Sequence, residues 1–250
     1  MTEDWRYFPC TMGESTAFIF VDVGITETID RAPANLVKIR LAYKNPHPNG
    51  LPSDEEFYAV GSIERALETF VTETSGWYIG RVTVDGHRHF YVYSAKEEAH
   101  WSSFLDSLSA TTGYQLEADT RSDPQHEGYW QDLYPTDDDW QVINDLAVID
   151  AIDRNGDNGT EPRQIDHWVY FGNQTGMLPF LTWARSEGFT HDEANSSSTD
   201  DGRYCLRLSH HGPAEITEIS HRTIALRRKA LEYGGEYDGW ETPVVSSKSS

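Results

Sequence analysis

The longest helical pattern in the sequence leads directly into Gly234-Gly235-Glu236-Tyr237-Asp238-Gly239-Trp240-Glu241-Thr242. A glycine pair can end a helix because glycine tolerates positive φ. The aromatic residues Tyr237 and Trp240 suit a strand that packs them against a sheet. The first interpretation is therefore a helix cap followed by an edge strand with aromatic residues in the core. The alternative is a binding role, in which one of these aromatic side chains is partly exposed and contacts a partner.

Upstream of this stretch, helical and strand patterns follow one another in a definite order. Residues 214–233 place apolar side chains at helical spacing, with acidic residues early and basic residues late, as the helix dipole favours. After a first helix, the order is strand, helix, strand, strand, helix, strand, which is the ferredoxin-like βαββαβ arrangement. The expected elements are a helix at 140–154, a strand at 164–171, a helix at 176–187, a short strand from 189, a strand at 204–208, the helix at 214–233 and the closing strand.

The first half of the sequence predicts a second α+β unit. Two apolar segments separated by turn-forming residues suggest an antiparallel hairpin, and Asp85-Gly86 between two further segments is a strong hairpin signal. Ser53 and Glu56 have the spacing of a capping box for a helix. The predicted order is ββαββαβ, an antiparallel sheet with helices on one face. The expected elements are strands at 17–23 and 36–43, a helix from 53, strands at 77–84 and 87–93, a helix at 97–109 and a strand at 114–118.

The boundary between the halves is predicted at Pro135-Thr136-Asp137-Asp138-Asp139, where a proline precedes an acidic run that can cap the next helix. The chain is then an α+β protein with domains at 1–136 and 137–245. Residues 246–250, a Ser/Lys segment with nothing to bury, are predicted to be a disordered tail. Each half is expected to fold alone.

Composition restricts the classes of function. The chain has 250 residues with 12% aromatic residues, which is typical of a folded protein. Its 41 acidic and 20 basic residues give a net charge of −21, which disfavours direct nucleic-acid binding and favours basic protein partners. Cys10 and Cys205 have no metal-ligand spacing and indicate free thiols in a reducing compartment. The start of the sequence lacks a leader pattern, and no apolar run is long enough to span a membrane, so a cytoplasmic location is expected.

Two polar segments have part of the pattern of a binding site, and both are interpreted as turns. Asp153, Asn155 and Asp157 have the first spacings of a calcium loop, but glycine falls at the seventh position and Gln164 replaces the final glutamate. The run 87–89, His-Arg-His, follows the predicted hairpin turn. Successive strand residues point to opposite faces, so this run is expected to be a solvated turn and not an anion site.

A metal-dependent hydrolase is the alternative from a different class of function. Several potential ligands stand near the ends of predicted strands and can converge there. Their spacings match no known ligand motif, and the sequence has no nucleophile elbow, P-loop or dinucleotide fingerprint. We therefore expect no catalytic residue, metal or cofactor. The candidate ligands of this alternative are Asp166, His167, His210, His211, Glu236 and Asp238.

Four segments of the second half resemble the RraB family, the protein inhibitors of the bacterial endoribonuclease E. They are 153–157 (Asp-Arg-Asn-Gly-Asp), 165–168 (Ile-Asp-His-Trp), 187–189 (Glu-Gly-Phe) and the closing Gly-Glu-Tyr-Asp-Gly-Trp motif. The resemblance implies a non-catalytic regulator of RNA metabolism that binds the regulatory region of a ribonuclease E-like enzyme. An acidic surface suits that task because it attracts basic segments. The candidate partner-binding residues are Glu236, Tyr237, Asp238, Trp240, Glu241, Asp166 and His167.

The first half resembles an uncharacterised bacterial family known only as a domain of unknown function and often joined to RraB-like domains. The resemblance covers residues 1–136 and includes Trp5-Arg6-Tyr7 and Leu133-Tyr134-Pro135. It implies no activity. The short RraB inhibitors lack such a half, so an adaptor or structural role for the whole chain stays open, as does the oligomeric state.

Overall fold

The structure is a computed structural model that describes residues 3–199 and 202–245. It divides into two compact units, Met1–Asp139 and Trp140–Ser250. The domain boundary at 136/137 stays a prediction, which separate expression of 1–136 and 137–250 would test. The predicted tail at 246–250 lies outside the described residues. None of the described helices is long and apolar enough to cross a bilayer.

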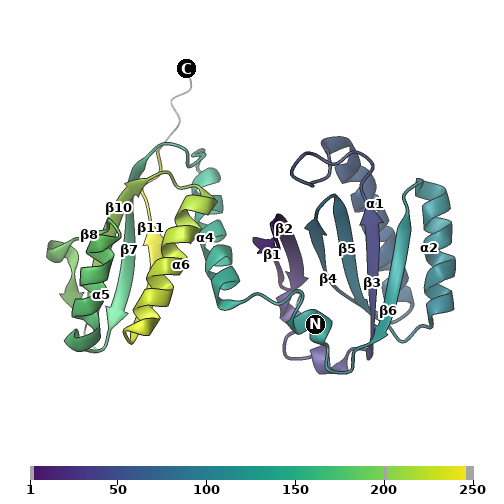
Figure 1. The fold of residues 1–250 in the computed structure, drawn as a ribbon, viewed down its shortest axis with the longest axis horizontal. Helices are drawn as coiled ribbons and strands as arrows, with labels where there is room; N and C mark the ends of the chain where they lie inside the picture. The colour runs from purple at the N-terminus through teal and green to yellow at the C-terminus, as the bar shows by residue number, and fades with distance from the viewer. Residues whose placement is uncertain (1–2, 200–201, 246–250) are drawn as a thin grey trace, which may run out of the picture. The chain divides into compact units, whose positions relative to one another are not determined.

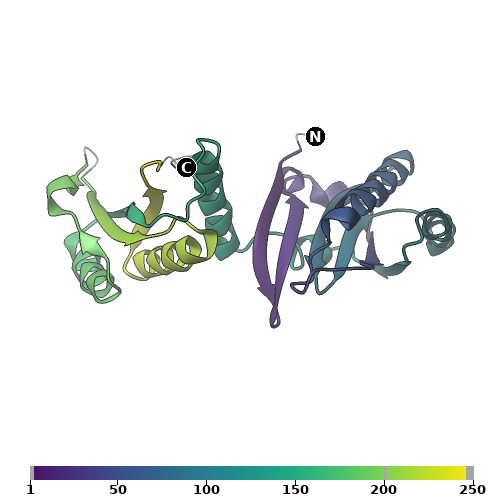
Figure 2. The ribbon, with the colours of Figure 1, turned by 90° about the horizontal axis from the view of Figure 1, so that it is seen from above.

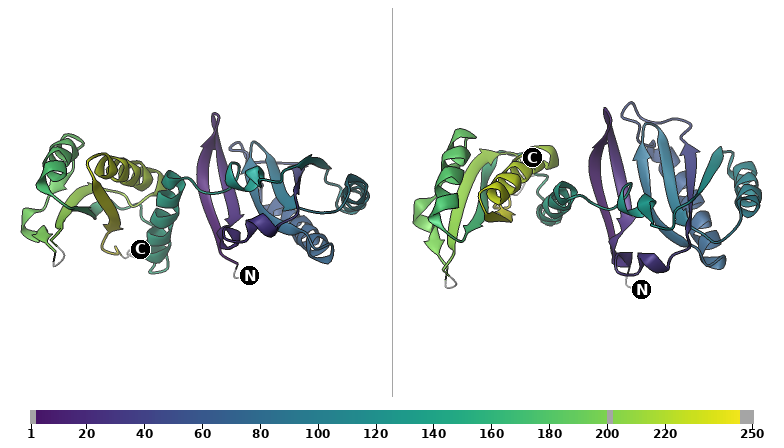
Figure 3. Two further views of the ribbon diagram at one scale, coloured as in Figure 1. Left: turned by 90° about the horizontal axis from the view of Figure 1, so that it is seen from below. Right: turned by 60° about the horizontal axis from the view of Figure 1, so that its bottom comes forward.

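Unit 1 is built on a six-stranded sheet in which every neighbouring pair is antiparallel. The strand order across the sheet is β1-β2-β4-β5-β3-β6. Helices α1 (Asp54–Glu73) and α2 (Glu98–Thr112) cover one face, and the segment after β6, with α3 (Glu127–Trp130), crosses the other (Figures 1 and 3). The strands are β1 (Trp5–Met12), β2 (Ser15–Asp22), β3 (Asn35–Ala42), β4 (Trp77–Val84), β5 (His87–Tyr93) and β6 (Leu116–Ser122), with short 3-10 turns η1 (Val23–Ile25) and η2 (Ile29–Arg31).

The fold class predicted for unit 1 is confirmed, but one strand was missed and one pairing was wrong. The missed strand is β1, an edge strand that tolerates Pro9 because its outer side needs no ladder partner. The predicted hairpin between β2 and β3 does not form, since β2 pairs with β1 and β4 while β3 pairs with β5 and β6. The β4–β5 hairpin, which turns at Asp85-Gly86 as predicted, lies between them.

The core of unit 1 lies between the two helices and the sheet. Ser53 caps α1 by accepting the N–H of Glu56, whereas the Glu56 carboxylate accepts the N–H groups of Lys44 and Asn45 instead of closing the capping box. Phe57, in the first turn of α1, is 62% exposed. The buried apolar residues that the helices add to this core are Val60, Ile63, Leu67 and Val71 of α1 with Trp101 and Leu105 of α2.

Unit 2 has the predicted ferredoxin-like arrangement. Its main sheet has the order β11-β7-β10-β8 with all neighbours antiparallel, as βαββαβ topology requires. Gly234 ends the last helix at φ +72°, which confirms the predicted cap. The elements are α4 (Asp137–Asp153), β7 (Arg163–Phe171), α5 (Gln174–Ser186), β8 (Thr190–His191), η3 (Glu193–Asn195), β9 (Ser197–Ser198), β10 (Tyr204–Gly212), α6 (Ile216–Glu232) and β11 (Gly235–Glu241).

Helices α5 and α6 lie on one side of the unit 2 sheet (Figure 2). Alternate residues of β7 and β10, among them Val169, Phe171, Leu206 and Leu208, point toward these helices and form the core. The two helices approach closely where α5 begins, because a Cβ added to Gly176 would collide with the carbonyl oxygen of Tyr233. The residues between the core positions point to the second face of the sheet.

Candidate partner-binding surface

The second face of the unit 2 sheet is open to solvent and carries polar and aromatic side chains. Cross-strand register places Trp168 opposite Arg207, and Tyr170 opposite both Cys205 and Glu236. Residues directly opposite in a ladder share a face, so these side chains form one surface. All five are half-buried or exposed. The sequence 165–170 alternates between the core and this surface, which is the period-2 signal that identifies Trp168 and Tyr170.

Arginine side chains lie over the aromatic rings of this open face. The guanidinium carbon of Arg207 is 5.7 Å from the ring centre of Trp168, and that of Arg203 is 4.8 Å from Tyr170. Arg207 Nη2 also donates to Asp166 Oδ2 at 2.7 Å, and Arg203 Nη1 reaches Glu236 at 3.3 Å. The result is a surface on which each cation contacts both a ring and a carboxylate.

The predicted partner-binding residues fall into two groups in the structure. Glu236, Asp238 and Glu241 are exposed along β11, beside the open face. Asp166 also lies on the open face, although its contacts leave it only 5% exposed. The other three point toward the helices: Trp240 is 7% exposed, His167 is fully buried and Tyr237 is half-buried. Whether any of these residues contacts a partner stays a proposal.

A buried carboxylate fixes the position of Trp240. Asp145 of α4 is fully buried and accepts a hydrogen bond from the Trp240 indole N–H at 2.9 Å. It also accepts bonds from Gln141 of its own helix and from Ser220 and Thr223 of α6. Burial raises the pKa of Asp145, and these four donors act against that rise. Asp145 therefore ties α4, α6 and β11 together, a role that its place in an apolar helix pattern did not reveal.

A second buried polar cluster, on the helix side of the sheet, contains two histidines. His167 Nε2 lies 2.9 Å from His210 Nδ1, and His167 Nδ1 lies 2.9 Å from the Tyr237 hydroxyl. Both rings are neutral when the hydroxyl donates to His167 and His167 donates to His210. Burial, His210 and Arg222 hold the pKa of His167 well below its usual value. Burial, Arg222 and His211 lower the pKa of His210 to about 4.

These lowered pKa values predict that acid destabilises unit 2. The unfolded chain takes up a proton at each histidine near pH 6.5, whereas folded His210 does so only near pH 4. The contribution of neutral His210 to the free energy of unfolding is therefore fully present above pH 6.5, and it is lost as the pH falls toward 4. At pH 5 we expect a loss of about 2 kcal/mol from His210 alone. Thermal melting of the full chain between pH 7 and pH 5 measures this loss.

The variant His210→Gln should lose less stability than the wild type over the same pH range, because the mutated site no longer titrates. His221→Gln is the matched control, since His221 is exposed on α6. An unchanged pH dependence in His210→Gln would contradict the prediction.

The candidate metal ligands do not meet at one point. His167 and His210 pair on the helix side of the sheet, whereas Asp166 binds Arg207 and Glu236 lies near Arg203 on the open face. Within residues 3–199 and 202–245, no group of three or more His, Cys, Asp or Glu is placed to hold a metal ion. Cys10 and Cys205 are both free and partly buried.

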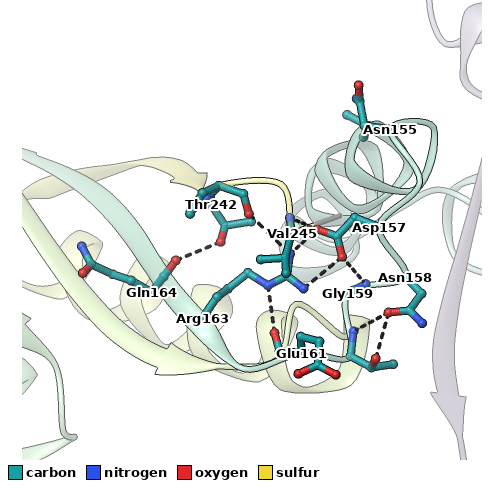
Figure 4. Close-up of polar contacts among 12 residues, drawn as sticks. Asn155, Asp157, Asn158, Gly159, Glu161, Arg163, Gln164, Thr242 and Val245 are labelled. Atoms are coloured by element: carbon teal, nitrogen blue, oxygen red, sulfur yellow. Dashed lines mark hydrogen bonds and ion pairs between the residues drawn. The ribbon is translucent and has the colours of Figure 1, made fainter. Parts of the chain in front are cut away.

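The calcium-like spacing at Asp153, Asn155 and Asp157 has a different function in the fold. Asp157 is buried and bonded to Arg163, and Asn155 points away from it (Figure 4). The Asn155 side chain donates instead to the carbonyl oxygen of Ala151. Arg163 also donates to the Glu161 carbonyl oxygen at 2.9 Å. The sequence reading of this loop as a polar turn agrees with these contacts, although it did not anticipate the buried ion pair.

Two segments of the chain match known protein families. Residues 3–134, more than half of the chain, match the family model described as Family of unknown function (DUF695). The chain belongs to this family. Residues 143–242 match the family model described as Regulator of ribonuclease activity B. Both resemblances found in the sequence are confirmed, and the second half is, in general terms, a regulator of ribonuclease activity.

Other comparisons add little. No protein of curated function matches the chain. A crystal structure of an unknown protein from Galdieria sulphuraria is 12% identical with a TM-score of 0.24, over 84% of this chain and 99% of that one. The structure titled "Crystal structure of putative glycine cleavage system transcriptional repressor" is 10% identical with a TM-score of 0.25, over 84% and 98%.

Proposed function

We propose that residues 137–245 inhibit an endoribonuclease of the ribonuclease E type by binding its basic regulatory region. The proposal rests on the match to regulators of ribonuclease activity and on one structural observation. The three exposed carboxylates of β11 lie beside an open sheet face that carries Trp168 and Tyr170. In this proposal the protein is not itself an enzyme and acts in the bacterial cytoplasm, where the ribonuclease lies.

The carboxylates and the aromatic side chains contribute to binding in different ways. Glu236, Asp238 and Glu241 attract a basic segment from a distance and set the rate of association and its salt dependence. Trp168 and Tyr170 supply area that loses water on contact and therefore slow dissociation. Trp240 and His167, which the sequence placed among the contacts, support the surface from the core in this proposal.

In the ion pairs of the open face, a basic residue of the partner can replace the arginine of this chain. Arg203 and Glu236 form a pair at 3.3 Å with side chains 43% and 70% exposed, so the pair contributes little to stability. An arginine or lysine of the partner can take the place of Arg203 on Glu236 at small cost. The same exchange at Asp166 is harder, because its pair with Arg207 is shorter and less exposed.

We predict that the full chain binds the purified regulatory region of the ribonuclease and that binding weakens as salt rises. Replacing the three β11 carboxylates (Glu236→Gln, Asp238→Asn, Glu241→Gln) should slow association about tenfold at low salt. Trp168→Ala should speed dissociation by roughly tenfold, the effect of losing an aromatic contact. Surface plasmon resonance at two salt concentrations measures both rates.

A matched control removes three exposed carboxylates away from the open face: Asp150→Asn, Glu218→Gln and Glu232→Gln. This variant carries the same net charge as the first and should bind almost as the wild type does. Equal loss in both variants would show that only net charge matters and would overturn the proposed surface. Binding without any decrease in cleavage rate would replace inhibition by an adaptor role.

A further inference from the structure

Unit 1 contains a pocket of about 300 Å³ between the β1–β2 hairpin and the start of α1. This volume is at the lower end of the range for ligand pockets. We call it the arginine pocket. It is lined by the aromatic side chains of Tyr7, Phe18, Phe20 and Phe57 and by Arg81 and Arg88.

The arginine pocket is open because the helices do not cover the whole sheet face. The ladder places Tyr7 opposite Phe20, and Phe20 opposite Arg81, so these side chains share the face on which α1 packs. Tyr7 is nevertheless 49% exposed, and Phe57 at the first turn of α1 is 62% exposed. The view in Figure 2 shows the β1–β2 hairpin at the edge of the sheet. Tyr7 and Phe57 therefore present apolar surface to solvent beside a cavity, an arrangement that fits a ligand pocket.

The floor of the pocket carries more positive than negative charge. Glu64 of α1 accepts hydrogen bonds from both Arg81 and Arg88, the second at 3.1 Å, and also from the Tyr78 hydroxyl. Arg88 and Glu64 are each 7% exposed. One carboxylate between two guanidinium groups leaves one positive charge without a contacting anion in the cluster. Because buried charge is costly unless paired, an anion entering the pocket from solvent would be bound favourably.

The aromatic walls add a preference for a flat ligand. Tyr7 and Phe18 are stacked, with ring centres 5.6 Å apart and planes 6° from parallel. The Arg81 guanidinium lies 4.2 Å from the ring centre of Phe20. Both guanidinium groups also act on the Tyr7 hydroxyl, whose pKa burial raises and the two arginines lower. An acidic group near Arg81 would therefore place an attached ring against Tyr7, Phe18 and Phe57.

We propose that the arginine pocket binds a small aromatic compound that bears one carboxylate or phosphate group. Its acid group pairs with Arg81 and Arg88, and its ring packs among the exposed aromatic side chains. Guanidinium groups bind both kinds of anion in a bidentate manner, so the pocket chemistry selects for charge and flatness. This site belongs to unit 1 and is independent of the ribonuclease proposal.

Isothermal titration calorimetry of the full chain tests this site. The probes are benzoate and phenyl phosphate, with benzamide as the neutral counterpart and inorganic phosphate as an anion without a ring. We expect at least one of the two aromatic anions to bind about tenfold or more tightly than benzamide and inorganic phosphate, from its charge-assisted bonds and ring contacts. Comparison of the two aromatic anions decides between carboxylate and phosphate.

Arg81→Gln should weaken the better probe about tenfold while the variant melts at nearly the wild-type temperature, because Glu64 keeps its hydrogen bonds from Arg88 and Tyr78. Arg65→Gln is the matched control, since Arg65 is an exposed residue of α1 outside the pocket. The proposal is overturned if neither aromatic anion binds more tightly than benzamide, or if inorganic phosphate binds as tightly as both. Equal binding by Arg81→Gln and Arg65→Gln would overturn it as well. Tyr7→Leu, which removes an exposed ring without touching the charges, separately tests the aromatic wall.

Discussion

Replacing Arg163 with alanine is expected to lower the free energy of unfolding of unit 2 by about 3–5 kcal/mol, the cost of breaking a buried ion pair. Arg163 and Asp157 are 4% and 1% exposed. Both terminal nitrogens of the guanidinium donate to the two oxygens of the carboxylate, the Nη2–Oδ1 pair at 2.9 Å. Truncating one partner leaves the other as an uncompensated buried charge, which is why the expected loss is large.

The ion pair also joins the loop after α4 and the start of β7 to the segment after β11, which is distant in the sequence. Asp157 follows α4, Arg163 begins β7, and the segment after β11 adds the N–H of Val245, which donates to Asp157 at 2.7 Å (Figure 4). Arg163 further donates to the Pro243 carbonyl oxygen at 3.4 Å. The loss of Arg163 should therefore loosen the loop after α4 and the end of β11 together.

Urea unfolding of the full chain measures the effect on the transition of unit 2. Arg154→Ala is the control, because Arg154 pairs with Asp150 at 4.0 Å with side chains 77% and 66% exposed. That exposed pair should contribute less than about 0.5 kcal/mol. A loss below about 1 kcal/mol for Arg163→Ala would show that the buried pair is not a main source of stability.

The change of stability at low pH is a second measure of the ion pair between Arg163 and Asp157. The hydrogen bonds from Arg163 are the main cause that lowers the pKa of Asp157. A lowered carboxyl pKa stabilises the protein above the unfolded value of 3.8, and this contribution is lost as the pH falls below that value. Arg163→Ala should therefore remove part of the acid sensitivity found below pH 4.

The sequence predicted the fold of unit 2 well because its signals are local. The strand composition of 164–171, the helical spacing of 214–233 and the glycine cap at Gly234 each depend on neighbouring residues, and the ferredoxin-like order follows from the order of these elements. The prediction that β2 pairs with β3 was wrong because the β4–β5 hairpin lies between these strands in the sheet. Local sequence patterns do not encode the position of that hairpin.

Buried polar residues were the least predictable part of the chain. Arg88 was expected in a solvated turn, yet it is 7% exposed and bonded to Glu64, which is distant in sequence. His167 gains its partners through tertiary contacts, as does Asp145 except for the hydrogen bond from Gln141 of its own helix. The candidate surface was predicted in part, since the carboxylates of β11 are exposed as expected for contact residues. Trp168 and Tyr170 were missed because the prediction placed them in a strand but did not say which face of the sheet each side chain occupies.

Replacing Asp145 with alanine is the second change from which we expect a large effect, about 3 kcal/mol of lost stability in unit 2. The carboxylate accepts hydrogen bonds from four donors, and no cationic side chain of the described residues pairs with it. Two of these, Ser220 and Thr223, carry hydroxyl groups that can rotate, and Thr223 already lies 3.4 Å from the Ser220 carbonyl oxygen. The Trp240 indole N–H is fixed in its ring, and the Gln141 amide is on a side chain that is only 7% exposed. Leaving two buried donors unpaired costs roughly 1–3 kcal/mol each.

Comparison of Asp145→Ala with Asp145→Asn separates the contribution of the accepted hydrogen bonds to stability from that of the negative charge. Burial raises the pKa of Asp145, so its ionised form is penalised at neutral pH, and a neutral asparagine escapes that penalty. Asp145→Asn keeps one acceptor oxygen and should lose only about 1 kcal/mol. Asp150→Ala, on the exposed side of the same helix, is the control and should change stability by less than about 0.5 kcal/mol. Urea unfolding of the three variants, with tryptophan fluorescence as the probe, gives the comparison. Equal losses for Asp145→Asn and Asp145→Ala would mean that the charge, and not the set of accepted hydrogen bonds, holds Trp240 and β11 in place.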